Sequence, residues 1–291
     1  MEIREKLDFA EKSFKQRGIK WNDNDGKIET AIKNALNDFT FRTTKKNDDI
    51  DFKGVEGLYQ KLNKDNALVI IFENYDKKNY GNDDAFDEWH NKTCEYVMSV
   101  LKTLYKDIHY GKAQKIVNMT FKYLYCLVDE NKRSYFDYCH IPLDSVILDW
   151  IWSQNEIMKE PYKEILKKKN GLPERLQHGY FDSWSNLEYE SNDRFLTSDN
   201  KHYSYMFYQK LIRELCEGKG ITPLQLEFLV WPQYQWERAA KEFYKQTENM
   251  LSIDNDKGKK TGNDLFNNIN KLLDDELDLV DWGSEFKDSQ K

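Results

Sequence analysis

The stretch that decides the fold is YGKAQKIVNMTFKYLY, residues 110–125. Its apolar residues recur with the spacing of an α-helix and occupy most of the circumference of that helix. A helix that is apolar nearly all round is expected to be buried. Three polar residues, Lys115, Asn118 and Lys122, fall on one stripe of it at positions i, i+3 and i+7. Because a buried lysine is costly unless its charge is paired or its amine is needed, this stripe is predicted to line a cleft or to meet partners.

A partner for Lys115 follows in HIPLDS, residues 140–145, where Asp144 precedes another apolar helical run. Aspartate at such a position is a good helix N-cap. We expect Asp144 to lie beside Lys115, an arrangement that suits Schiff-base chemistry. The alternative is that Lys115 and Lys122 extend to the surface and pair with acids there, with Asp149 a candidate partner for Lys122.

Helical periodicity recurs through most of the chain, which predicts an all-α fold. The predicted helices lie near residues 3–14, 28–39, 58–62, 83–107, 112–128, 144–151, 160–169, 208–215 and 224–244. Residues 67–72, ALVIIF, are the best strand candidate, but no β partner lies nearby and a buried helix is predicted instead. Residues 177–205 are polar and aromatic without a clear period, which is typical of a long functional loop.

The acidic charge is concentrated at the end of the chain. The 291 residues carry a net charge of −7, and residues 246–291 hold 11 acids and 6 lysines, so that this tail carries −5 and the remainder −2. We therefore divide the chain into a helical domain, residues 1–245, and an acidic tail with an amphipathic helix, residues 246–291. Lysines gather between residues 102 and 122 with only one acid among them. Local clustering permits nucleic-acid binding despite the negative total.

The sequence does not indicate a membrane protein, a secreted protein, a metal site or a disulfide framework. No apolar run is long enough to cross a bilayer, and the charged start of the chain does not resemble a signal peptide, so a cytoplasmic protein is expected. The four cysteines, Cys94, Cys126, Cys139 and Cys216, form no Cys-x-x-Cys pair. We predict neither a metal site nor a disulfide framework, and no cofactor.

Residues 108–152 resemble the helix-hairpin-helix DNA glycosylases, particularly the archaeal 8-oxoguanine type. In that family a glycine-containing hairpin leads into a helix whose first-turn lysine is the nucleophile. A second lysine follows seven residues later, and a Pro-x-Asp segment brings the catalytic aspartate. Gly111, Lys115, Lys122 and Asp144 match these positions, whereas Ala113 stands where a second glycine is common.

The resemblance implies two helical lobes that flank a cleft, with the helix-hairpin-helix near residues 84–128. It implies a DNA N-glycosylase with AP lyase activity, in which Lys115 is the nucleophile and Asp144 its carboxylate partner. The expected partner is double-stranded DNA with the damaged or modified base flipped out. The superfamily also includes members associated with removing hypermodified bases from foreign DNA, so that phage defence is one expected setting.

Further residues are expected around this pair. Gly111, Lys112, Lys122 and His140 are candidate DNA contacts, although a hydrogen-bonded structural role is the alternative for His140. Trp150, Trp152 and Trp231 are candidates for the base pocket, with core packing as the alternative for each. Two non-enzymatic hypotheses stay open: a helical module that binds nucleic acid or protein, and a protein whose acidic tail mimics DNA.

Overall fold

The structure of the chain is a computed structural model. It describes residues 3–20, 26–39, 44–47, 50–77, 82–153, 184–189 and 204–232. These residues are mostly helical and include no β-strand, which confirms the all-α class. None of the described helices combines the length and the apolar character that crossing a lipid bilayer requires. The predicted helix at 160–169, most of the polar loop at 177–205 and the acidic tail at 246–291 lie outside the described residues.

The structure describes the following helices in chain order. They are α1 (Ile3–Gly18), α2 (Lys27–Asp38), α3 (Gly54–Leu62), η2 (Lys64–Asn66), α4 (Ala67–Lys77), α5 (Asp83–Leu104), α6 (Tyr110–Leu127), η3 (Glu130–Phe136), α7 (Ser145–Ser153), η4 (Trp184–Asn186) and α9 (Tyr205–Cys216). Residues 223–232 form a further helix. The segment ALVIIF lies in α4, so that the helix predicted there is confirmed.

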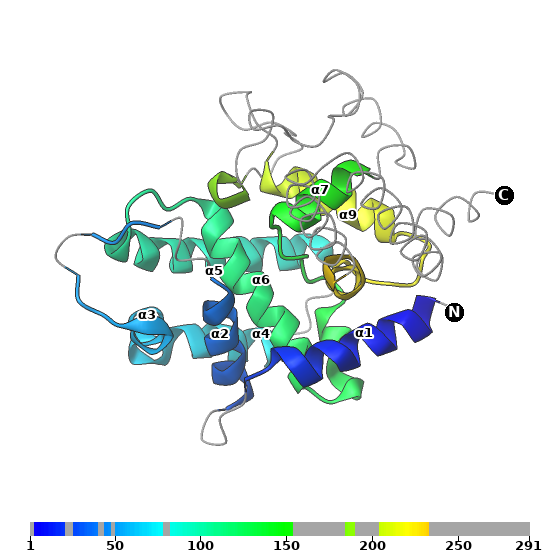
Figure 1. Cartoon of the computed structure of the whole chain (residues 1–291), viewed down its shortest axis with the longest axis horizontal. Coiled ribbons are helices and arrows are strands. Elements are labelled where there is room, and N and C mark those ends of the chain that lie inside the picture. The colour runs from blue at the N-terminus through cyan, green and yellow to red at the C-terminus, as the bar shows by residue number, and fades with distance from the viewer. Residues whose placement is uncertain are drawn as a thin grey trace, which may run out of the picture.

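Helix α6 is the centre of the described structure (Figure 1). Every residue from Tyr110 to Cys126 is buried, as the all-round apolar pattern predicts. Helix α2 packs along α6, and α5 lies against it as well. In Figure 1, α7 and α9 lie above the middle of the molecule, while α2, α3 and α4 lie below it. The core therefore forms around α6, and every polar side chain of α6 must find a partner inside the protein.

Helix α5 ends earlier than the predicted 83–107. Its start is well defined, because the Asn82 side chain accepts a hydrogen bond from Ala85 N at 2.9 Å. At its end Tyr105 leaves the helix and forms an isolated antiparallel bridge with Lys46. Asp107 then takes a positive φ of 55°, a conformation that an α-helix excludes.

Helix α6 begins at Tyr110, two residues before the predicted start, so that Lys115 lies in the second turn and not in the first. His109 is the N-cap but makes no side-chain capping hydrogen bond. One backbone amide of the first turn finds its acceptor elsewhere in the chain, since Gly111 N donates to Leu187 O at 2.9 Å. Residues 184–189 thus lie across the start of α6.

Gly111 is required by this crossing. A Cβ atom at residue 111 would lie 1.9 Å from Trp184 O and 3.0 Å from Ser185 C, both of them backbone atoms that cannot turn away. We therefore expect Gly111→Ala to lower the free energy of unfolding by about 1–3 kcal/mol, the usual cost of overpacking. Urea denaturation measures the loss. Gly26→Ser is the matched control, because a Cβ there meets nothing within 4 Å. Equal stability of the two variants would contradict the observed crossing.

Candidate active site

Lys115 and Asp144 meet, as the sequence predicts. Lys115 Nζ lies 2.7 Å from Asp144 Oδ2, although the two residues are 29 positions apart. Their side chains are 10% and 14% exposed, so the ion pair is largely buried and still reaches solvent. It joins the second turn of α6 to the start of α7.

The Asp144 carboxylate is fixed by four hydrogen bonds. Oδ1 accepts from Val146 N at 3.0 Å and from Ile147 N at 3.1 Å, which confirms Asp144 as the N-cap of α7. Oδ2 accepts from Lys115 Nζ and, at 3.1 Å, from Trp231 Nε1. Burial raises the pKa of Asp144, but the Lys115 charge and these hydrogen bonds outweigh it and hold the pKa below its ordinary value. Asp144 is therefore an immobile anion at neutral pH.

Lys122 is buried inside the protein, which corrects its predicted role as a phosphate contact. Its side chain is 3% exposed and forms an ion pair with Glu227, which is fully buried. Its ammonium group also lies 4.1 Å from the centre of the Phe14 ring and 5.6 Å from that of Trp231. The acid found beside Lys122 is Glu227, whereas Asp149 was the candidate from sequence.

The DNA contact predicted for His140 is also corrected, because this side chain is fully buried and its structural alternative holds. His140 Nε2 lies 2.6 Å from Asp87 Oδ1, and its Nδ1 lies 2.8 Å from Tyr205 Oη. The Tyr205 hydroxyl accepts from Asn118 Nδ2 at 2.8 Å, so it donates to His140 Nδ1, and Nε2–H donates to Asp87. Burial lowers the pKa of His140 to about 4, which agrees with this neutral tautomer.

Asp87 is the charged end of that chain of hydrogen bonds. Both of its carboxylate oxygens accept from the Arg213 guanidinium, at 2.6 and 3.0 Å. Burial raises the pKa of Asp87, yet His140 and Arg213 outweigh it and hold the pKa far below its ordinary value. The network ties α5 and α9 to the segment that carries Asp144.

Lys112 and Gly111 do not present a phosphate site in this structure. The Gly111 amide is occupied by Leu187 O, and Lys112 is 2% exposed. Lys112 Nζ lies 5.5 Å from the centre of the Phe39 ring and 5.1 Å from that of Trp184. Burial lowers the pKa of Lys112. The predicted phosphate contacts are therefore replaced by contacts within the chain.

The tryptophans predicted for a base pocket divide into three cases. Trp150 is 6% exposed and belongs to the hydrophobic core. Trp231 is half-buried and donates to Asp144, so it lies at the candidate site. The side chain of Trp152 lies outside the described residues.

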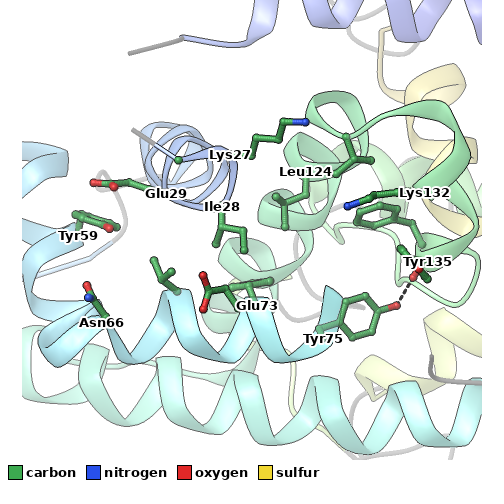
Figure 2. Close-up of a pocket in the computed structure, with 15 residues that line it drawn as sticks. Lys27, Ile28, Glu29, Tyr59, Asn66, Glu73, Tyr75, Leu124, Lys132 and Tyr135 are labelled. Atoms are coloured by element: carbon green, nitrogen blue, oxygen red, sulfur yellow. Dashed lines mark hydrogen bonds between the residues drawn. The ribbon is translucent and has the colours of Figure 1, made fainter. Parts of the chain in front are cut away.

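A described cavity of about 380 Å³ lies away from this pair. It is bordered by the start of α2, by α4, by the end of α6 and by η3, and neither Lys115 nor Asp144 lines it. Figure 2 shows Ile28, Glu73 and Leu124 around its centre and the hydrogen bond from Tyr75 to Tyr135. We assign it no role in the site.

Sequence inspection missed Glu227 as a site residue, and it named Trp231 without foreseeing its contact with Asp144. They lie four positions apart in the helix of residues 223–232, so both point to one face of it and reach Lys122 and Asp144 respectively. The available signal was an acid in the mostly apolar run LQLEFLVW, residues 224–231, because a buried acid needs a basic partner.

The comparisons with known proteins give no neighbour. No protein-family model, no curated protein and no solved structure matches this chain. The site must therefore be interpreted from its own geometry.

The pairing of Lys122 with Glu227 predicts a particular pattern of stabilities. Lys122→Met alone leaves the Glu227 carboxylate buried without its cation, and should cost about 3–5 kcal/mol of unfolding free energy. Adding Glu227→Leu removes the orphaned charge and should restore most of that loss. Urea denaturation of the two variants measures both free energies of unfolding. A double variant no more stable than Lys122→Met would show that the two side chains are not coupled.

Proposed function

We propose that this protein is a DNA N-glycosylase with AP lyase activity, acting on a damaged or modified base through a Schiff base on Lys115. The observation that carries the proposal is the contact of Lys115 with Asp144, at 2.7 Å, in which both side chains remain partly exposed to solvent. These are the two positions that match the lysine and the aspartate of the helix-hairpin-helix glycosylases. The short connection from α5 to α6 through residues 105–109 and the packing of α5 on α6 are compatible with such a hairpin.

The chemistry assigns different tasks to the two side chains. The Lys115 ammonium group first releases a proton to water. The neutral amine then attacks C1′ of the deoxyribose while the bond from C1′ to the base breaks, and the base leaves with the bonding electrons and takes up a proton from water. Opening of the sugar ring gives the Schiff base. Loss of a proton from C2′ then allows the 3′ phosphate to leave, which is the lyase step.

Asp144 acts in this proposal by its charge. A carboxylate with a lowered pKa is a poor proton acceptor, so that a role as general base is disfavoured. A fixed anion is well suited to stabilise the positive charge that develops on the sugar as the base departs. Since the four hydrogen bonds already orient the carboxylate, no reorganisation is needed when the substrate arrives.

The substrate in this proposal is double-stranded DNA. A base inside a duplex cannot reach Lys115, so the target base must be flipped out. Trp231 is the described aromatic side chain placed to border such a base, since its indole N–H already contacts Asp144. Oxidised bases and the modified bases of phage DNA are the two substrate classes to test.

The alternative is a non-catalytic helical module that binds nucleic acid or protein. One observation favours it: an ion pair held by four hydrogen bonds also works as a structural tie between α6 and α7. The two functions differ in whether the Lys115 amine ever becomes covalently bound.

Borohydride trapping distinguishes the glycosylase from the non-catalytic module. We expect the wild-type protein to form a reducible covalent adduct with a duplex from a panel carrying 8-oxoguanine, phage-type modified bases or an abasic site. Lys115→Arg should abolish the adduct while it keeps the ion pair with Asp144, because a guanidinium is not a nucleophile at neutral pH. Lys102→Arg, at an exposed position of α5, is the matched control and should trap normally. An undiminished adduct with Lys115→Arg, or none with wild type on any duplex, contradicts the proposal.

Asp144→Asn tests the electrostatic task. Asparagine can keep the capping hydrogen bonds to Val146 and Ile147 but carries no charge. We expect DNA binding to persist and single-turnover base release to slow by about 10²–10³-fold, the usual loss for one preorganised electrostatic group. Base release at the wild-type rate would remove Asp144 from the mechanism.

A further inference from the structure

Two glutamines hold the extended segment that leads to Asp144. Gln114 Nε2 donates to Leu143 O at 2.7 Å, and its Oε1 accepts from Leu143 N at 3.2 Å. Gln209 does the same for Ile141, with Nε2 donating to Ile141 O at 2.9 Å and Oε1 accepting from Ile141 N at 3.2 Å. Each side-chain amide therefore pairs with both backbone groups of one residue, as a neighbouring β-strand would.

Asn118 joins these two contacts. Its Nδ2 lies 2.9 Å from Gln114 Oε1 and 3.2 Å from Ile141 O, and its Oδ1 lies 2.8 Å from His90 Nε2. Gln114, Asn118 and Gln209 are all fully buried. In such surroundings an unmade hydrogen bond costs the full desolvation of its donor or acceptor. The segment cannot slip relative to α6 without breaking several of these bonds together.

The position of Gln114 gives this arrangement its consequence. Gln114 directly precedes Lys115 in α6, and the residue it holds, Leu143, directly precedes Asp144. The distance between the two functional side chains is therefore set by a hydrogen-bonded pair of their immediate neighbours. Packing of apolar side chains alone would leave the irregular segment free to shift by fractions of an ångström, which matters because a misplacement of about 1 Å can cost 10²-fold in rate.

We infer that Gln114 is the positioning residue of the Lys115–Asp144 pair, holding Leu143 by both of its backbone groups and so fixing Asp144 opposite the lysine. The catalytic consequence of this inference rests on the proposed glycosylase function, whereas the structural coupling does not. Gln209 holds the segment three residues before Asp144 and has a weaker influence on the pair.

The first experiment compares Gln114→Met with the control Gln209→Met. Each variant keeps the side-chain volume and loses two hydrogen bonds to the segment before Asp144, and Gln114→Met also loses the bonds of Gln114 to Gly111 O and Asn118 Nδ2. We expect the single-turnover trapping rate at saturating protein to fall on the order of 100-fold for Gln114→Met, with unchanged DNA affinity, and much less for Gln209→Met. Adding Gln114→Met to Asp144→Asn should cause no further loss, because the glutamine acts only through the aspartate. Losses that multiply in this double variant, or equal losses in the two single variants, overturn the inference.

A second measurement does not depend on activity. A double-mutant cycle of Lys115→Gln and Asp144→Asn on the unfolding equilibrium gives the coupling of the ion pair. We expect this coupling in the wild-type background and its loss in a Gln114→Met background; coupling that persists there overturns the inference. If Gln114→Met does not fold, Gln114→Asn replaces it, since it keeps the amide but withdraws it from Leu143 by one methylene group.

The two measurements distinguish the possible failures. If the wild-type protein forms no adduct but the coupling depends on Gln114, the proposed function fails while the positioning role stands. If the adduct forms on Lys115 but the coupling does not depend on Gln114, the positioning role fails and the proposed function stands.

Discussion

The ion pair between Lys115 and Asp144 is the interaction on which the described structure depends most. It joins α6, whose residues are buried from Tyr110 to Cys126, to Asp144, the N-cap of α7. Taking a lysine out of water is costly unless a carboxylate meets it with good geometry and the remaining hydrogen-bonding groups are satisfied. Here the carboxylate is held by two backbone amides and an indole N–H besides the lysine. The pair is therefore preorganised before any ligand binds.

The three lysines of α6 considered as functional residues are used in three different ways. Lys112 lies among the rings of Phe39 and Trp184, and Lys122 pairs with the buried Glu227. Of the three, Lys115 keeps the largest exposed fraction, 8% against 2% for each of the others. A nucleophile needs both a shielded environment and a route for its substrate, and among these three Lys115 combines them best. The buried network of Asp87, His140 and Arg213 holds the segment that leads to Asp144.

The sequence predicted those features that arise from local patterns. The burial of α6, the helix at ALVIIF and the N-cap at Asp144 follow from apolar spacing and from the chemistry of one side chain. The meeting of Lys115 and Asp144 was predicted because a buried lysine demands an acid and the next helix offered one. No comparable rule could assign Glu227 to Lys122 or Trp231 to Asp144, since these contacts join segments about a hundred residues apart. The crossing of residues 184–189 over Gly111 was hidden for the same reason, and it is what turned the expected phosphate site into an internal contact.

In the proposed reaction, the amine of Lys115 is the reacting group beside an anionic Asp144. Mass-spectrometric peptide mapping of the borohydride-reduced protein–DNA adduct tests it most directly, after nuclease digestion has trimmed the DNA. We expect to find the sugar remnant on the peptide that contains Lys115, at that lysine. A remnant at any other lysine or at the chain's α-amino group would contradict it.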